Sequence, residues 1–406
     1  MNRKWSIACL LLVSLSLALP ARAQQASVPE IQFESVPNPL KLPPDINFGE
    51  IAGVAVNSKG HIFVFSRGNV NGPSYMAAAA QLLEFDATGR FIREIGKNLY
   101  AWSYAHAVKI DKQDNIWVVD KGSDTILKMN PEGRVQYVFG RKGEASHYQA
   151  PPDTAATLSG ILRRAGLDTK PLLPANPRNP PPVHQDGYFN QPTDVAWDAD
   201  GNAYFSDGYV NSRVAKVSAR GEWLQSWGSF GTGPGQFDTP HGVAIAPNGE
   251  VYVADRGNRR IQIFDQQGTF KRQFTIDVPV PAGIKAAIGA TPKPEEMMSM
   301  GSMAPGAPDA LCMTPGPNPV IFTVDLYPGR IYKVSLDGKV LGVYGKSGKN
   351  LGEFGWGHAI ACPSENEIWV GELLNWRVQK LVVKGTAAAA PRPAAARAPA
   401  ASAPAK

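Results

Sequence analysis

The sequence predicts an all-β fold, a six-bladed β-propeller. Five segments align without gaps over about 20 residues, and a sixth is a diverged copy. Each copy alternates apolar and polar residues with a period of two, which indicates strands separated by Gly- or Asn-containing turns. Units of roughly 40–50 residues with four short strands are typical of propeller blades. The aligned segments begin at Ala52, His106, Thr193, His241 and His358.

Each copy has the same internal order. A first strand, a polar turn and a second strand are followed by a loop, a third strand and usually a fourth strand such as "GRVQYVFG". The second strand ends at an acid 14 residues after the start in four copies, and Ser66 takes that place in the first. The diverged copy is anchored by "IFTVDLYPG", and counting back 14 residues from Asp325 places its first position near Leu311. The four acids are Asp120, Asp207, Asp255 and Glu372.

The repeats set the expected domain boundaries. We expect the propeller to span residues 48–384, preceded by an N-terminal segment at 24–47. Within that segment, "IQFESV" at 31–36 is expected to supply a strand that closes the ring with the last blade. Two insertions interrupt the pattern at 143–185 and 279–310, and both are expected to form surface loops or lids.

The two ends of the chain have non-globular compositions. Residues 1–23 join a positive start, an apolar run and small residues up to Ala23, which predicts a secretory signal peptide. We therefore expect an exported protein, periplasmic or extracellular. The apolar run is short for a membrane span, and no later segment is apolar enough for one. Residues 385–406 are rich in Ala and Pro and are expected to be disordered.

Charge and cysteine content limit the partners further. Without Arg3, Lys4 and Arg22 of the signal peptide, the formal net charge falls from +6 to +3. That charge is too weak and too scattered to predict nucleic-acid binding. Cys312 and Cys362 remain, and export permits a disulfide between them. Two buried thiols are the alternative, and the sequence leaves both open.

Three histidines share one repeat position. His106, His241 and His358 occupy the first position of the second, fourth and sixth copies. First strands line the axis of a propeller, and alternate blades of six are about 120° apart. Three inward imidazoles predict a metal site with an open fourth position, which suits zinc, although imidazole also suits Cu, Ni and Fe. A polar residue tolerated at the channel mouth is the alternative for any single histidine.

The loops after the second strands should lie on the same face as the three histidines. They carry Tyr209 in the third copy, Arg67 in the first and Arg256 in the fourth. Tyr209 could act as a general base if neighbouring positive charges lowered its pKa. Arginines are suited to binding a carboxylate. The acids that end the second strands either support the histidines or organise the loop backbone; the second role fits their recurrence in a copy without histidine.

Two stretches resemble a known family. "FNQPTDVAWDADGNAYFSDGYVNSRVAKVS" at 189–218 and "GPGQFDTPHGVAIAPNGEVYVADRGNRRIQIF" at 233–264 are similar to neighbouring blades of peptidyl-α-hydroxyglycine α-amidating lyases. These enzymes are six-bladed propellers built from NHL-type repeats. The resemblance covers most of residues 48–384 and is weak at 279–350.

The resemblance implies a lyase that cleaves an N–Cα bond of an α-hydroxyglycine-type substrate, giving an amide and glyoxylate. It implies that His106, His241 and His358 hold a zinc ion. It also implies that Tyr209 takes the hydroxyl proton, while Arg67 and Arg256 bind the substrate carboxylate and the phenolate charge.

Three positions depart from the family. Trp356 stands where the family has a methionine, and Val210 stands where it has a disulfide cysteine. Ala359 replaces an acid associated with a structural calcium, so the resemblance leaves Ca²⁺ binding open. A small-molecule or peptide-end substrate is nevertheless the partner that it implies.

Other functions remain alternatives. The main one is a non-catalytic propeller that binds a protein or another ligand in the cell envelope through its faces. A lactonase-type hydrolase would typically use carboxylates around a metal, whereas the repeat position here offers histidine. The "MMSMGSM" segment at 297–303 is either a methionine-containing loop or a Cu(I) site.

Overall fold

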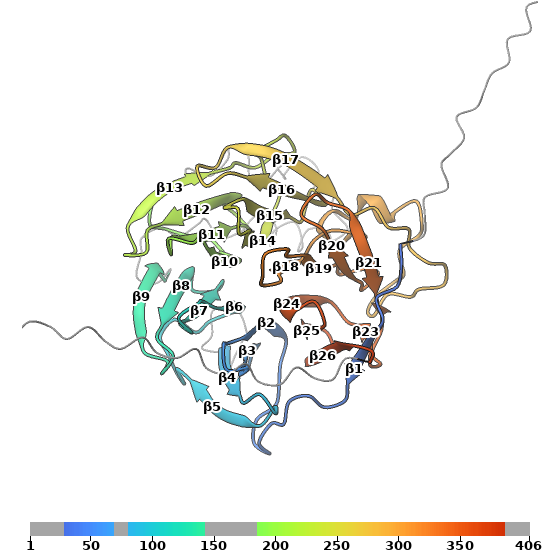
Figure 1. The fold of residues 1–406 in the computed structure, drawn as a ribbon, viewed down its shortest axis with the longest axis horizontal. Helices are drawn as coiled ribbons and strands as arrows, with labels where there is room; N and C mark the ends of the chain where they lie inside the picture. Colours follow the sequence, from blue (N-terminus) through green and yellow to red (C-terminus); the bar gives the residue numbers. More distant parts are fainter. Residues whose placement is uncertain (1–27, 69–79, 143–184, 386–406) are drawn as a thin grey trace, which may run out of the picture.

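The computed structural model describes residues 28–68, 80–142 and 185–385. Six four-stranded antiparallel sheets are arranged around one axis (Figure 1), which confirms the predicted six-bladed β-propeller. The signal peptide predicted at 1–23, nearly all of the insertion at 143–185 and the tail beyond Gly385 lie outside the described residues. In the described part of the chain, no helix has the length and hydropathy needed to cross a membrane.

In the first five blades, the strands run from the axis outward in chain order. Blade one comprises β2 (Ile51–Val56), β3 (Ile62–Arg67), β4 (Ala80–Phe85) and β5 (Phe91–Ile95). Blade two comprises β6 (Ala105–Ile110), β7 (Ile116–Asp120), β8 (Thr125–Met129) and β9 (Val135–Gly140). Blade three comprises β10 (Asp194–Trp197), β11 (Ala203–Asp207), β12 (Arg213–Val217) and β13 (Trp223–Trp227). Blade four comprises β14 (Pro240–Ile245), β15 (Val251–Asp255), β16 (Arg260–Phe264) and β17 (Phe270–Thr275). Blade five comprises β18 (Ala310–Met313), β19 (Ile321–Val324), β20 (Ile331–Val334) and β21 (Val340–Tyr344).

Blade six joins the two ends of the described chain. Its inner strands are β24 (Gly357–Ser364), β25 (Glu367–Glu372) and β26 (Arg377–Val383), and its outermost strand is β1 (Phe33–Val36). Phe33 pairs with Val383 in the antiparallel register. The Phe33 ring also lies 5.5 Å from the ring of Tyr344 in blade five. The segment expected to close the ring therefore lies beside the last strand and against the preceding blade.

Burial explains the pattern of the strands. The second strand of blade four, VYVAD, is buried at every residue, because a neighbouring blade packs on each face. The outermost strand, FKRQFT, alternates partly buried and exposed residues, as expected for a strand with one wet face. Apolar clusters fill the spaces between adjacent blades; Phe65 of blade one, for example, packs 4.9 Å from Trp102 before blade two.

Outside the blades, β22 (Lys346–Ser347) and β23 (Glu353–Phe354) form a short parallel pair between blades five and six. The insertion at 279–310 contains two 3₁₀ turns, η2 (Met297–Ser299) and η3 (Gly301–Met303). Its methionines at 298 and 303 are exposed, whereas Ala304 and Ala307 are buried against the propeller. The insertion thus begins on the surface and returns to the core as blade five starts.

The recurring acids hold the loops that enter each blade. Asp120, Asp207, Asp255 and Glu372 each accept a hydrogen bond from the backbone N–H 17 residues earlier, and Ser66 does the same through its hydroxyl. In blade five, the corresponding bond from Gly306 to Asp325 spans 19 residues. The acids therefore organise loop backbone, as their recurrence in a blade without histidine suggests.

The two extra residues of blade five correct one sequence assignment. The turn between its first two strands is closed by Thr314 and Val320, six residues apart, whereas the turn in blade four is closed by Ala246 and Glu250, four apart. Counting back 14 residues from Asp325 therefore fails. The first position of blade five is Asp309, and Leu311 is instead a fully buried core residue.

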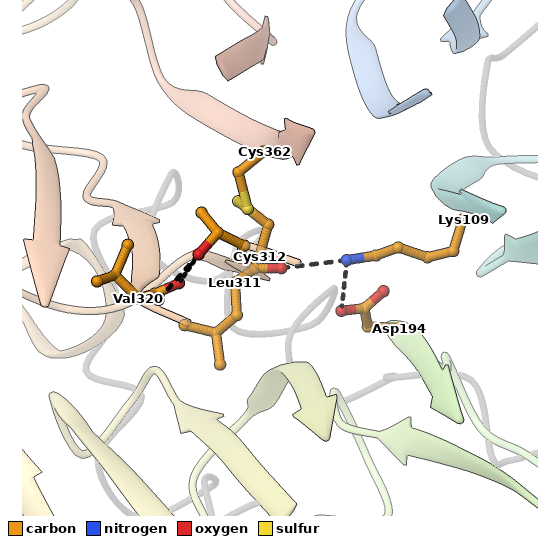
Figure 2. Close-up of a disulfide and its surroundings, with 7 residues drawn as sticks. Lys109, Asp194, Leu311, Cys312, Val320 and Cys362 are labelled. Carbon is orange, nitrogen blue, oxygen red and sulfur yellow. Dashed lines mark hydrogen bonds and ion pairs between the residues drawn. A yellow bond between two sulfur atoms is a disulfide. The ribbon is translucent and has the colours of Figure 1, made fainter. Parts of the chain in front are cut away.

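A disulfide joins blades five and six. Cys312 of β18 and Cys362 of β24 are linked, with their Cα atoms 5.9 Å apart. Figure 2 shows this bond near the axis. Of the two alternatives that the sequence leaves open, the structure has the bridge.

A partly buried lysine lies near the axis and near this disulfide (Figure 2). Nζ of Lys109 in β6 donates a hydrogen bond to the carbonyl oxygen of Leu311 at 3.1 Å and pairs with Asp194 at 3.3 Å. These contacts connect blades two, three and five. Asp194 is buried, and its Oδ1 has no hydrogen-bond partner among the described residues. The ammonium is therefore the main electrostatic support of that carboxylate.

We expect Phe33→Ala to lower the free energy of unfolding by about 3–5 kcal/mol, because a buried ring at the closure of the propeller is lost. Glu34→Ala, at the exposed neighbouring position, is the matched control and should change the free energy of unfolding by less than about 0.5 kcal/mol. Denaturant unfolding measures both. Equal effects of the two substitutions would show that the β1 side chain does not stabilise the closure.

Lys109→Met should lower the free energy of unfolding by about 3–5 kcal/mol, because Asp194 is left buried without its counter-ion. The double variant Lys109→Met/Asp194→Leu should recover most of that loss, since both charges are then removed. Lys112→Met, at an exposed position in the adjacent turn, is the control. A double variant no more stable than the single one would contradict the electrostatic explanation.

Candidate metal and substrate site

The three histidines of the repeat meet on the axis. His106 of β6, His241 of β14 and His358 of β24 are buried, and their ring centroids are 4.7–5.0 Å apart. One ring nitrogen of each lies within 4.8 Å of the others. Among the described residues, no other group of three His, Cys, Asp or Glu side chains is arranged to hold a metal ion.

The orientation of each imidazole is set by the next blade. Nδ1 of His106 contacts the carbonyl oxygen of Thr193 at 2.6 Å, Nδ1 of His241 contacts that of Asp309 at 2.6 Å, and Nδ1 of His358 contacts that of Ala52 at 3.0 Å. Each carbonyl belongs to the first repeat position of the following blade. A carbonyl can only accept, so Nδ1 carries the proton and Nε2 is left as a ligand atom.

The Nε2 atoms fit a metal ion. Nε2 of His358 is buried and has no hydrogen-bond partner among the described residues. A buried polar atom of this kind calls for a ligand. Burial lowers the pKa of all three imidazoles well below the usual 6.5, with neighbouring positive charges adding to the effect. Neutral imidazoles with fixed Nδ1–H groups are the form that binds metals.

Tyr209 reaches the histidine ring from the loop after β11. Its hydroxyl lies 2.9 Å from Nε2 of His241 and 3.4 Å from Nε2 of His106. Gly208 permits this approach, because a Cβ at that position would lie 2.0 Å from the carbonyl oxygen of Pro240. A glycine before the tyrosine is therefore a local requirement of the loop that carries Tyr209 inward.

The two predicted arginines lie beside Tyr209, and each already has a carboxylate partner. Arg67 pairs with Glu50 at 2.6 Å and stacks 3.9 Å from the centroid of the Tyr104 ring. Arg256 pairs with Asp309 at 3.1 Å, and its guanidinium carbon lies 5.6 Å from the centroid of the Tyr209 ring. Together with the three histidines and Tyr209, these arginines form one cluster at the position that the repeat register predicts.

The charge balance around the phenol favours its neutral form. Burial raises the pKa of Tyr209, whereas Arg256 and Arg67 lower it and Asp309 raises it further. Burial is the largest of these effects, so the two arginines alone do not make Tyr209 a base. Additional positive charge beside the hydroxyl is needed to form a phenolate at neutral pH.

Two residues of the site are not among those that the sequence analysis predicts. Asp309 binds Arg256 and accepts a hydrogen bond from Nε1 of Trp356 at 3.2 Å, so it shapes the wall next to His241. Lys121 places Nζ 3.6 Å from the centroid of the Tyr209 ring. It follows an acid of the repeat, as Arg67 and Arg256 follow Ser66 and Asp255. Reading that position in every blade finds Lys121.

Two positions next to the ring bear on the calcium ion that the resemblance leaves open. Ala359, which follows His358, is a buried core residue. Below the histidines lies a cavity of about 20 Å³, lined by Asp194 and Lys109 among others. That volume is room for roughly one water molecule. The nearest carboxylate there, Asp194, already pairs with the ammonium of Lys109.

Several known proteins are similar to this chain in sequence. The NHL repeat family profile matches residues 237–264, which hold the first three strands of blade four. Peptidylglycine α-amidating monooxygenase of Rattus norvegicus is 30% identical over 237 residues, covering 53% of this chain and 20% of that protein. Peptidyl-α-hydroxyglycine α-amidating lyase 1 of Drosophila melanogaster is 24% identical over 371 residues, covering 84% of this chain and 59% of that protein.

A relative whose name states no activity is similar to the same degree. NHL repeat-containing protein 3 of Homo sapiens is 28% identical over 255 residues, covering 58% of this chain and 59% of that protein. The chain spans about a fifth of the length of the rat monooxygenase. The predicted resemblance is confirmed: this chain is a six-bladed β-propeller with an NHL-repeat match at residues 237–264, and it is similar in sequence to proteins named peptidyl-α-hydroxyglycine α-amidating lyase.

Proposed function

We propose that this protein is a zinc-dependent lyase that splits the N–Cα bond of an α-hydroxyglycine-type substrate into an amide and glyoxylate. One observation carries the proposal: the Tyr209 hydroxyl touches Nε2 of both His241 and His106. A proton-transfer group thus lies against a set of three neutral imidazoles. Similarity to relatives named as amidating lyases supports the reaction type.

His106, His241 and His358 would hold the ion, and zinc is preferred because three imidazoles with an open fourth position suit it. When bound, such a cation supplies positive charge that acidifies a hydroxyl at the open position and lowers the pKa of Tyr209. The two arginines alone do not supply enough positive charge beside the Tyr209 hydroxyl to form the phenolate.

The side chains of the protein would then move one proton. Tyr209, as the phenolate, takes the proton of the substrate hydroxyl. The electron pair released from that O–H bond forms the C=O bond of glyoxylate, while the pair of the N–Cα bond leaves with the nitrogen. Tyr209 returns the proton to that nitrogen, so the amide is neutral and the phenolate is restored. Arg256 and Arg67 stabilise the phenolate and the anionic substrate.

A second candidate is a non-catalytic module that binds a protein or another ligand through the propeller faces. The similarity to NHL repeat-containing protein 3 favours it, because that name states no reaction. Either function is proposed for an exported protein, periplasmic or extracellular. Metal content and glyoxylate release together discriminate between the two.

We expect the purified protein to bind one equivalent of zinc, and the triple variant His106→Ala/His241→Ala/His358→Ala to bind none. Metal analysis after dialysis measures this. Zinc should also raise the Tm of the wild type but not of the triple variant. His61→Ala is the control, since that histidine pairs with Glu84 in blade one. Zinc retained by the triple variant would show that the three histidines are not the site.

Tyr209→Phe should lower kcat for glyoxylate release from an α-hydroxyglycine substrate by about 10²–10⁴-fold, because the group that transfers the proton is removed. Zinc content should remain unchanged. Unchanged turnover in the variant would exclude Tyr209 as the base. A wild type that binds zinc stoichiometrically but releases no glyoxylate would leave the metal site standing and contradict the lyase reaction.

A further inference from the structure

Three cations occupy one repeat position around the site. The residue that follows the recurring acid, or Ser66 in its place, is Arg67 in blade one, Lys121 in blade two and Arg256 in blade four. Blades five and six have leucine there, at 326 and 373. The positive charges therefore gather on the side of the ring that carries Tyr209.

The two arginines are neutralised within the protein, but the lysine is not. Arg67 pairs with Glu50, and Arg256 pairs with Asp309. Nζ of Lys121 forms no hydrogen bond or ion pair with any residue that the structure describes. It lies 3.6 Å from the Tyr209 ring centroid and 5.4 Å from that of Tyr104. The pocket thus holds one more cation than carboxylate.

Keeping the Lys121 ammonium charged without a carboxylate partner in this position costs free energy. Lys121 is partly buried, and burial, followed by repulsion from Arg67 and Arg256, lowers its pKa to about 7. Two tyrosine faces compensate only partly, since a cation–π contact stabilises a cation less than an ion pair in a desolvated site does. A ligand that brings a negative charge to this ammonium would offset the remaining cost.

We infer that Lys121 is a specificity-determining residue that binds the carboxylate of a small anionic ligand at the histidine site. The identity of that ligand as an α-hydroxyglycine-type acid or glyoxylate rests on the proposed function. The arginines, held by Glu50 and Asp309, contribute positive potential, whereas Lys121 supplies the free hydrogen-bond donors.

The alternative role for Lys121 is to pack on Tyr209. The two roles differ in which ligands they affect. A counter-ion distinguishes a carboxylate from its neutral amide, whereas a packing residue affects both ligands alike. Glyoxylate and glyoxylamide form such a pair, because they share the aldehyde and differ in the charge of one group.

The test compares these two ligands in zinc-loaded wild type, Lys121→Met and Lys121→Arg by titration calorimetry. We expect Lys121→Met to weaken glyoxylate binding by about 10- to 100-fold and to leave glyoxylamide binding unchanged. Lys121→Arg should restore most of the glyoxylate affinity. Lys112→Met, an exposed lysine in the same blade, should bind both ligands like the wild type, and all variants should keep one equivalent of zinc.

The outcomes separate this inference from the lyase proposal. Equal losses for both ligands, no loss for glyoxylate, or no glyoxylate binding by the wild type at millimolar concentration would each overturn the role of Lys121. Selective loss of glyoxylate binding supports that role even if the wild type releases no glyoxylate from an α-hydroxyglycine substrate. In that case, the reaction fails and the carboxylate site remains.

Discussion

The candidate site depends on the hydrogen bonds that run from each imidazole Nδ1 to a carbonyl of the following blade. Histidine and carbonyl alternate around the axis, so no blade contains a complete site. The bond from His358 to Ala52 connects residues 306 positions apart and crosses the junction between the last blade and the first. The orientation of that imidazole therefore requires a closed ring, which β1 and β26 complete at the outer edge of blade six.

On the Tyr209 side of the ring, nearby positive charges oppose the effect of burial on the pKa values of Tyr209 and Asp309. Asp309 and the imidazoles are buried and Tyr209 is partly buried, and burial shifts each of them toward its neutral form. The nearby cations act in the other direction on Tyr209 and Asp309, but they do not outweigh burial there. The site is thus poised for added charge: a cation among the imidazoles and an anion beside the lysine would each restore a balance that the protein groups leave incomplete.

Much of this arrangement could be predicted because the propeller repeats one register. The histidines, Tyr209, Arg67 and Arg256 lie together since equal positions in different blades face one axis or one rim. Asp309 could not be placed by the same count, because two extra residues in the turn of blade five change the spacing. Lys121 was predictable in register, but its lack of a counter-ion depends on side-chain contacts that the sequence does not contain. The disulfide likewise requires the distance between two strands 50 residues apart.

Lys109 also affects whether a molecule can pass along the axis of the propeller. It lies in the central channel between the histidine ring and a larger cavity of about 300 Å³ on the other side, while the space directly below the ring holds about 20 Å³. That space is room for roughly one water molecule, so the described residues leave no wide passage along the axis. If the proposed function holds, substrate and product would therefore enter and leave on the Tyr209 side of the ring, and a product that stayed there would exclude the next substrate.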